Sequence, residues 1–178
     1  GNGWGIYIEG QDGHQARNIQ IGDDEPGAGN LISGNTYGVT ARGAGAQEVR
    51  VEGNFIGTNA DGDESIPNAT GIYVEDAPGV VIGGTELSAG NLISGNSGIG
   101  ISLLRGDAAV IQGNLIGTDS TGTEALLTDW PAGFGSAWGI YAVDTSDLLI
   151  GGSEDGAGNV ISGNTNAVII DGPSSRGN

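Results

Sequence analysis

The sequence predicts an all-β fold, a right-handed parallel β-helix of about five coils in a two-coil alternating repeat. Three observations predict this solenoid: phrases that return along the chain, short runs of alternating apolar residues, and abundant glycine. Glycine supplies 37 of the 178 residues, well above a usual share of about 7%. The glycines do not recur at every third residue, which excludes collagen, and they are interleaved with Ile, Val and Leu, which argues against a flexible linker. We expect one domain over residues 1–178, either an excerpt of a longer array or a building block for one.

The internal repeat defines the coils. The phrase Gly-Asn-Leu-Ile-Ser-Gly-Asn stands at 29–35 and 90–96, and returns with valine in place of leucine at 158–164. A sister phrase, Gly-Asn-(Phe/Leu)-Ile-Gly-Thr, lies at 53–58 and 113–118. The two phrases alternate, so the true period is a pair of coils. Boundaries placed before each Gly-Ile-like start give these predicted coils and a last strand: 5–37, 38–70, 71–97, 98–138, 139–166 and 167–171.

Each coil is expected to contain about three short strands. Apolar residues alternate with other residues over short runs, as at Ile6 and Ile8 or at Ile72 and Val74. A period of two with β-branched residues predicts strands, and no stretch shows a convincing helical stripe of period 3.6. One coil cannot bury its own apolar face. Coils stacked about 4.8 Å apart join those faces into one core.

One asparagine of each phrase falls at the same point of five successive coils. Stacked in register, the side-chain amides would hydrogen-bond from coil to coil. The isoleucines two residues further on would form an aliphatic stack. Folding alone explains both columns, which are Asn30, Asn54, Asn91, Asn114 and Asn159, and Ile32, Ile56, Ile93, Ile116 and Ile161.

These phrases carry a resemblance to a known group of proteins. "GNLISGN" paired with "GNFIGTNADG" and "GNLIGTDSTG", together with "VVIGG" and "LLIGG", resembles the right-handed parallel β-helix repeats of large bacterial and archaeal secreted or surface proteins. The resemblance covers nearly the whole chain. It implies an extracellular or cell-surface location and a fold shared with pectin-lyase-like enzymes. It implies no defined reaction.

Composition excludes several classes of function. Twenty-two acidic residues face five arginines and no lysine, which gives a formal net charge of −17. Such a surface repels nucleic acid and anionic membranes. No apolar run approaches the roughly 20 residues of a membrane span, so we expect no membrane insertion. The absence of cysteine excludes disulfides and thiolate metal sites. The acidity fits either solubility in salty surroundings or the collection of divalent cations.

Catalytic groups are few, and we predict no catalytic residue. A lyase or epimerase needs a base and a cation beside the substrate carboxylate. His14 is the only histidine and falls in a Gly/Gln-rich loop, where we expect a solvated turn residue. Arg42, Arg50 and Arg105 are the arginines that neighbouring coils could bring together, but no carboxylate-plus-arginine cluster is repeated around them.

The fold requires no cofactor, and calcium is the candidate ligand. Asn59, Asp61, Asp63 and Glu64 place oxygen-bearing side chains around a glycine, as calcium loops do. The equivalent loop at 119–124 has threonines at two of these positions. Asp, Asn, Gly and Thr are also what ordinary turns prefer. A second acidic set, expected to be a solvated edge, lies in the turns of the odd coils: Asp23, Asp24, Glu25, Glu86, Glu154 and Asp155.

The fourth coil carries the longest insertion and several aromatic residues. A loop that lengthens one coil of a solenoid and concentrates aromatic rings is a candidate recognition site. The alternative is that the loop covers a patch of the solenoid with its own rings. The candidate ligand-binding residues are Asp129, Trp130, Phe134 and Trp138.

The leading functional hypothesis is a structural or adhesive extracellular segment. Its expected partners are copies of itself or neighbouring β-helical repeats, through end-to-end association, and polysaccharide at the loop between Trp130 and Trp138. The second hypothesis is a polysaccharide lyase or epimerase that acts on uronate polymers with Arg42 or Arg105 in a cleft. The third is a calcium-stabilised surface module.

Overall fold

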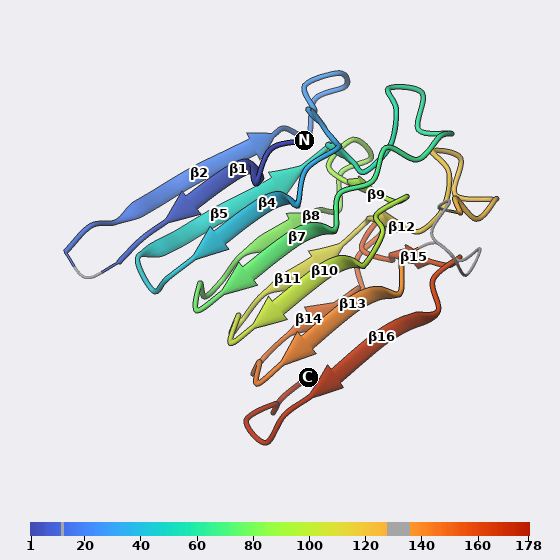
Figure 1. Ribbon diagram of the computed structural model, residues 1–178. Coiled ribbons are helices and arrows are strands. Elements are labelled where there is room, and N and C mark those ends of the chain that lie inside the picture. The colour runs from blue at the N-terminus through green and yellow to red at the C-terminus, as the bar shows by residue number, and fades with distance from the viewer. Residues whose placement is uncertain (12, 128–135) are drawn as a thin grey trace.

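The computed structural model describes residues 1–11, 13–127 and 136–178, and it confirms the predicted parallel β-helix (Figure 1). The chain winds through successive coils, and each complete coil contributes one strand to each of three sheets. All strand pairs within these sheets are parallel. Within the described part of the chain there is no helix, and hence no helix that could cross a membrane.

The three sheets are built by strands that lie one coil apart in the sequence. The first sheet has six strands in the order β1 (Trp4–Glu9), β4 (Tyr37–Arg42), β7 (Thr70–Glu75), β10 (Ile99–Leu104), β13 (Trp138–Val143) and β16 (Asn166–Asp171). The second contains β2 (Ala16–Gly22), β5 (Ala46–Glu52), β8 (Val81–Gly83), β11 (Val110–Gln112) and β14 (Leu149–Ile150). The third contains β3 (Leu31–Ile32), β6 (Phe55–Ile56), β9 (Leu92–Ile93), β12 (Leu115–Ile116) and β15 (Val160–Ile161).

The predicted coil boundaries agree with the first sheet to within one residue. Its strands begin at Trp4, Tyr37, Thr70, Ile99, Trp138 and Asn166, where the sequence predicted starts at 5, 38, 71, 98, 139 and 167. The predicted aliphatic stack is also confirmed, because Ile32, Ile56, Ile93, Ile116 and Ile161 are direct partners in the third sheet. Ile56, Ile93 and Ile116 are fully buried. Burial of each such side chain stabilises the folded state by about 1.5–3 kcal/mol.

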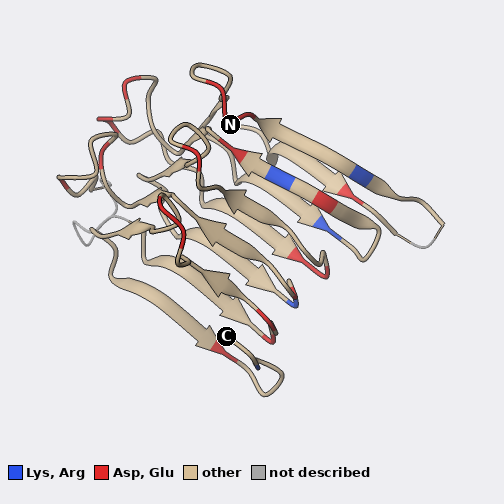
Figure 2. Cartoon of the chain, turned by 180° about the vertical axis from the view of Figure 1, so that it is seen from behind, with Lys and Arg blue, Asp and Glu red and all other residues tan. Residues whose placement is uncertain are grey.

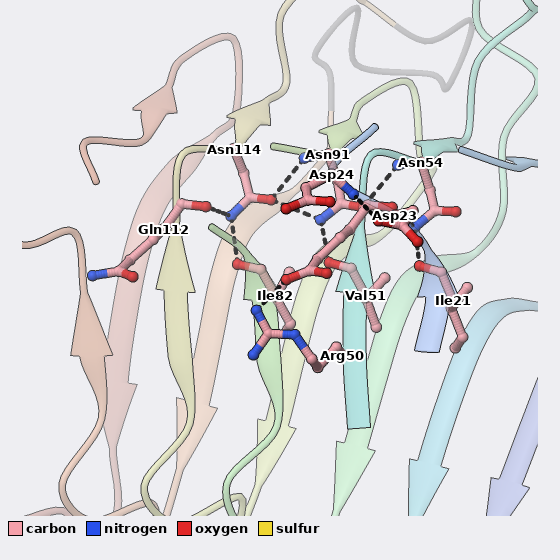
Figure 3. Close-up of polar contacts among 11 residues, drawn as sticks. Ile21, Asp23, Asp24, Arg50, Val51, Asn54, Ile82, Asn91, Gln112 and Asn114 are labelled. Carbon is pink, nitrogen blue, oxygen red and sulfur yellow. Dashed lines mark hydrogen bonds and ion pairs between the residues drawn. The ribbon is translucent and has the colours of Figure 1, made fainter. Parts of the chain in front are cut away.

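The predicted asparagine ladder runs through all five coils of the third sheet. Figure 3 shows three of its members, Asn54, Asn91 and Asn114. Asn91 shows its bonding: its Oδ1 accepts the backbone N–H and the Nδ2–H of Asn54, both at 3.0 Å. Its Nδ2 donates to the carbonyl of Val51 at 2.7 Å and to Asn114 Oδ1 at 2.9 Å. Every polar atom of this buried side chain is therefore paired, as a buried amide requires.

A second asparagine ladder stands between the third and the first sheet. Nδ2 of Asn2, Asn35 and Asn68 donates to Oδ1 of the asparagine one coil further on, and the series ends at Asn96. In the fourth coil Ser136 takes the equivalent position and donates its Oγ–H to the carbonyl of Asn96 at 3.1 Å. Oδ1 of Asn164, in the fifth coil, is buried and has no hydrogen-bond partner among the described residues. The second ladder is thus interrupted at Ser136.

A column of left-handed residues runs along the second sheet, within β2 and β5 and just before β8, β11 and β14. Its members in five coils have φ of 55° at Asn18, 57° at Glu48, 70° at Gly79, 56° at Ala108 and 54° at Asp147. A single glycine stands in this column, although the left-handed region costs other residues roughly 1–2 kcal/mol. Asparagine and aspartate tolerate the conformation through local hydrogen bonds, whereas alanine has no such relief.

Asn91→Ala is expected to lower the free energy of unfolding by at least about 2 kcal/mol. The substitution removes the acceptor of the Asn54 backbone N–H and a donor to the Val51 carbonyl, and each unpaired buried group costs roughly 1–3 kcal/mol. Asn114 Oδ1 keeps a partner, because it also accepts the backbone N–H of residue 91. Chemical denaturation measures the change. Asn30→Ala is the matched control at the exposed end of the ladder, and its loss should stay below about 1 kcal/mol. Equal losses in the two variants would contradict the ladder as the source of stability.

Ala108→Gly is expected to raise the free energy of unfolding by up to about 1 kcal/mol. Glycine does not pay the roughly 1–2 kcal/mol that the left-handed backbone costs alanine in the folded state. The greater conformational freedom of glycine in the unfolded chain offsets about 0.4–1 kcal/mol of this gain. The neighbouring Ala109 is buried and its φ is not positive, so Ala109→Gly should destabilise. Chemical denaturation of both variants tests whether the left-handed backbone of Ala108 is strained. A lower stability of the Ala108→Gly protein would contradict this strain.

Candidate functional site

Aromatic side chains gather on the outer face of the first sheet. Tyr7, Tyr73 and Tyr141 occupy one outward column, at the position that Thr40 fills in the second coil and Ser102 in the fourth. A neighbouring column starts each strand. These residues include all four tyrosines and two of the three tryptophans of the chain. We call this surface the aromatic face; its members are Trp4, Tyr7, Tyr37, Tyr73, Trp138 and Tyr141.

A glycine at the second position of the first five strands of this sheet allows both columns to face outward. In β7 the consecutive residues Gly71 and Ile72 are both buried, while Thr70 and Tyr73 on either side are partly exposed. The inward glycine has no space for a side chain, because a Cβ on Gly71 would lie 2.6 Å from the carbonyl oxygen of Gly100. The Gly-Ile-Tyr phrase therefore makes a corner that turns two residues, three positions apart, toward solvent.

The rings of the aromatic face lie in pairs. Trp4 and Tyr7 have ring centroids 5.1 Å apart, Tyr37 and Tyr73 are 5.4 Å apart, and both pairs are tilted. Trp138 and Tyr141 are 5.0 Å apart with an interplanar angle of 25°, so they are stacked. Such contacts are worth about 0.5–1.5 kcal/mol beyond burial. Each ring is thus held in place by a neighbour while part of its surface stays open to solvent.

The Thr40 hydroxyl lies within the tyrosine column. Thr40 stands between Tyr7 and Tyr73 in register and is only 2% exposed. Its Oγ1 has no hydrogen-bond partner among the described residues. An unpaired buried hydroxyl costs roughly 1–3 kcal/mol, so folding alone does not account for threonine here.

Charged residues border the aromatic face at the ends of the strands. The Glu75 carboxylate forms ion pairs with Arg42, at 2.8 Å from Nε, and with Arg105, at 3.4 Å from Nη2. Arg105 also forms a two-pronged pair with Asp76, at 2.6 Å from Nε and 2.9 Å from Nη2. This hydrogen bond lowers the pKa of the Asp76 carboxyl, and the Glu75 carboxylate raises the pKa of Arg42. Both shifts favour the ionised forms of Asp76 and Arg42.

The arginines are divided between two faces of the solenoid. Arg42 and Arg105 lie on either side of Glu75, a meeting that the sequence raised as an option. Arg50 lies on β5 of the second sheet and pairs with the buried carboxylate of Glu52 (Figure 3). His14 is exposed, and its backbone N–H donates to the Gln11 carbonyl at 2.8 Å within a turn. The predicted turn role of His14 is confirmed.

The predicted calcium loop is organised by its asparagine. Asn59 Oδ1 accepts the backbone N–H of Gly62 at 2.8 Å, of Asp63 at 3.1 Å and of Glu64 at 3.3 Å. Asn59 Nδ2 donates to Asp63 Oδ1 at 2.7 Å. These bonds give Asn59 the role of a turn former. Across the described ranges no group of three or more His, Cys, Asp or Glu side chains is arranged to hold a metal ion. Calcium binding by Asn59, Asp61, Asp63 and Glu64 stays a prediction.

The equivalent loop of the fourth coil uses an aspartate for the same purpose. Asp119 Oδ1 accepts the backbone N–H of Thr123 at 3.1 Å and of Glu124 at 3.2 Å. Thr121 Oγ1 donates to its other oxygen at 2.7 Å. The Thr121 hydrogen bond, followed by the backbone amides, lowers the pKa of the Asp119 carboxyl.

The predicted recognition loop of the fourth coil is described only in part. Asp129, Trp130 and Phe134 lie outside the described residues. Trp138 is the first residue of β13 and belongs to the aromatic face. The recurring Gly-Ile-Tyr phrase could have revealed this face, because it places a tyrosine at one point of every odd coil. In the sequence we took the phrase only to indicate where each coil begins.

Comparison of the chain with protein-family models, with curated proteins and with solved structures finds no match. The strand pairing of the described residues establishes an all-β parallel solenoid by itself. We infer the function from the side chains on the surface of this chain.

Asp119→Asn is expected to reduce the loss of stability in acid and to leave the neutral-pH fold intact. A carboxyl whose folded pKa is lowered stabilises the protein above its unfolded pKa, near 3.8. That contribution disappears as the pH falls through the lower, folded pKa. Asparagine keeps the acceptor oxygen, as Asn59 shows in the equivalent loop, and it does not titrate.

Thermal unfolding of both proteins between about pH 7 and pH 2.5 measures this effect. Thr121→Ala is the companion variant, because it removes the hydrogen bond that contributes most to the lowered pKa of Asp119, and it should reduce the loss of stability in acid in the same direction. If the difference in melting temperature between wild type and Asp119→Asn is the same at every pH, the hydrogen bonds to Asp119 do not set its stability contribution.

Proposed function

We propose that this chain is a rigid adhesive segment of an extracellular or cell-surface protein and that its aromatic face binds a linear, neutral polysaccharide. The observation that carries the proposal is the collection of every tyrosine of the chain on one outward face of one sheet. Aromatic rings that are partly exposed and arranged in a row provide flat apolar platforms with polar edges. The flat faces of pyranose rings stack on such platforms.

The spacing of the rings fits a linear sugar chain. Strands of neighbouring coils are about 4.8 Å apart, so Tyr7, Tyr73 and Tyr141 in alternate coils recur about every 10 Å along the solenoid. An extended chain of equatorially linked pyranose rings presents one ring per coil at this spacing and turns the same ring face outward at every second ring. Thr40 and Ser102 occupy the intervening positions of the same column and are buried, so the aromatic rings supply the contacts to the sugar.

The net charge favours a neutral polymer. A formal charge of −17 repels uronate chains, and both arginines beside the aromatic face are already paired with carboxylates. Rigidity supports binding as well. Tyrosine and tryptophan offer a large contact area at a low cost in side-chain entropy, and rings fixed by their neighbours are ordered before the ligand arrives.

The surface location is supported by the likeness to β-helical repeats of bacterial and archaeal surface proteins, which share the pectin-lyase-like fold. The absence of cysteine and the acidity of the chain are compatible with a secreted protein. One observation favours the second candidate function, a lyase or epimerase for uronate polymers: Arg42, Glu75, Asp76 and Arg105 form one cluster beside the aromatic face. Product analysis separates the two candidates.

Trp138→Ala and Tyr141→Ala are each expected to weaken polysaccharide binding by about tenfold, which corresponds to about 1.4 kcal/mol. Each change removes one ring of the stacked pair and the support of its neighbour. Affinity electrophoresis or calorimetry with a panel of neutral and uronate polysaccharides, with and without calcium, measures the binding. Phe55→Ala is the matched aromatic control, because Phe55 lies on the third sheet.

The same incubations are followed for chain length and for unsaturated ends. Binding of neutral polymers without shortening, lost in the Trp138 and Tyr141 variants alone, is the expected result. Shortened or unsaturated products that disappear in Arg105→Ala would establish the lyase instead. No binding by the folded wild-type protein to any polymer would overturn the adhesive proposal.

A further inference from the structure

A second surface, on the outside of the third sheet, has features that the polysaccharide proposal does not use. Its floor is a column of apolar side chains in register, one from each strand: Leu31, Phe55, Leu92, Leu115 and Val160. Leu31 is 50% exposed and Val160 is 41% exposed. The first four lie in a groove that Leu87 also lines. We call this surface the third-sheet groove.

Two rows of turns wall the groove. On one side the turns 59–64 and 119–124 of the even coils are bonded to each other, because Ser120 Oγ donates to the Asp61 carbonyl at 2.9 Å and the Ser120 N–H donates to the Gly62 carbonyl at 3.0 Å. They rest directly on the floor: a Cβ on Gly62 would lie 2.7 Å from a methyl group of Leu92. On the other side stand the turns 23–28 and 84–89 of the odd coils.

The odd-coil wall carries an apolar residue that folding does not require. The turns of the first and third coils each contain the same internal hydrogen bond. In the first coil the Ala28 amide donates to the Glu25 carbonyl at 3.1 Å, and in the third coil the Ala89 amide donates to the Glu86 carbonyl at 3.0 Å. Leu87 stands at the tip of the second of these turns and is fully exposed. An exposed leucine that borders an apolar groove indicates an interaction surface.

Every charged residue in the four wall turns is acidic. These residues are Asp23, Asp24, Glu25 and Glu86 on one side, and Asp61, Asp63, Glu64, Asp119 and Glu124 on the other. Figure 2 shows acidic stretches on these turns and the arginines elsewhere. Neighbouring carboxylates in this wall interact. The hydrogen bond with Asp23 and the negative charges of Asp23 and Glu52 raise the pKa of Asp24. The groove is thus apolar along its floor and negative along both rims.

We propose that the third-sheet groove docks an amphipathic α-helix of a partner protein, with an apolar stripe flanked by lysine or arginine on both sides. One turn of an α-helix advances about 5.4 Å, close to the coil spacing of about 4.8 Å. Apolar side chains on successive turns of the helix therefore match the spacing of the floor, as in other helix-in-groove complexes. They reach Leu31, Phe55 and Leu115, because Leu92 is only 3% exposed. The basic flanks meet the two acidic rims, which supplies charge complementarity.

Other occupants fit this groove less well. Side chains on one face of an extended strand recur about every 6.8 Å, which departs from the coil spacing within a few residues. A second copy of this chain would bring its own acidic surface, since it has five arginines and no lysine against 22 acidic residues. The basic amphipathic helix matches the spacing and the charge together.

The test uses the full chain and a synthetic helical peptide with leucine at positions i, i+3, i+4 and i+7 and lysine on both flanks. Fluorescence anisotropy is expected to show binding that weakens as salt rises, because the rim contacts are screened. Leu87→Ser and Leu31→Ser should each weaken it by about tenfold. Glu25→Gln and Glu86→Gln should reduce its salt dependence. Leu149→Ser, at an exposed leucine of the second sheet, is the matched control and should change nothing.

Two further peptides decide the outcome. A scrambled peptide of equal composition and a peptide with glutamate in place of lysine should not bind. Equal binding of the scrambled peptide, equal affinities in the Leu87 and Leu149 variants, or no binding at low salt would each overturn the proposal. Circular dichroism confirms that each variant is folded. Polysaccharide binding by the aromatic face should be unchanged in all groove variants. A negative result for the helical peptide therefore leaves the polysaccharide proposal untouched, and the reverse also holds.

Discussion

Coil-to-coil register is the constraint on which the rest of the molecule depends, and the buried asparagine amides fix it. A parallel sheet by itself can slip, but an amide that must meet the next amide leaves one alignment. Asn54, Asn91 and Asn114 each use both ends of the side chain in this way. A slip by one residue would leave donors and acceptors unpaired in every coil, at roughly 1–3 kcal/mol for each group. The aliphatic stacks then follow, because isoleucine always lies above isoleucine.

Fixed register also explains why the surface properties come in columns. Once coils are aligned, a residue type repeated at one point of the sequence period becomes a stripe on the outside. The tyrosines of the odd coils become the aromatic face, and the hydrophobic residue before each buried isoleucine becomes the floor of the third-sheet groove. The acidic turns become two rims for the same reason. The two proposed binding surfaces therefore arise from a single ordering device.

The sequence predicted the coils, the first asparagine ladder and the isoleucine stack, because these depend on phrases repeated almost letter for letter. It did not predict the second ladder. Asn68, a central member, lies outside any repeated phrase, and Ser136 replaces asparagine in the fourth coil. The aromatic face was also missed, because strict alternation would put Trp138 and Tyr141 on opposite sides of a strand. Only the glycine corner, visible in the buried Gly139-Ile140 pair, turns both outward. The ion pairs around Glu75 join side chains from three coils, which no local pattern encodes.

The interrupted second ladder has a mechanical consequence. Strand hydrogen bonds and ladder amides both join one coil to the next, so a pull along the solenoid axis loads the coil interfaces in series. A series of joints yields at its weakest member. Around the fourth coil Ser136 makes one bond where its neighbours share amides, and Asn164 Oδ1 has no partner within the described residues. A solenoid held by its ends would therefore extend first at this joint, which would limit the force that the other coil interfaces carry.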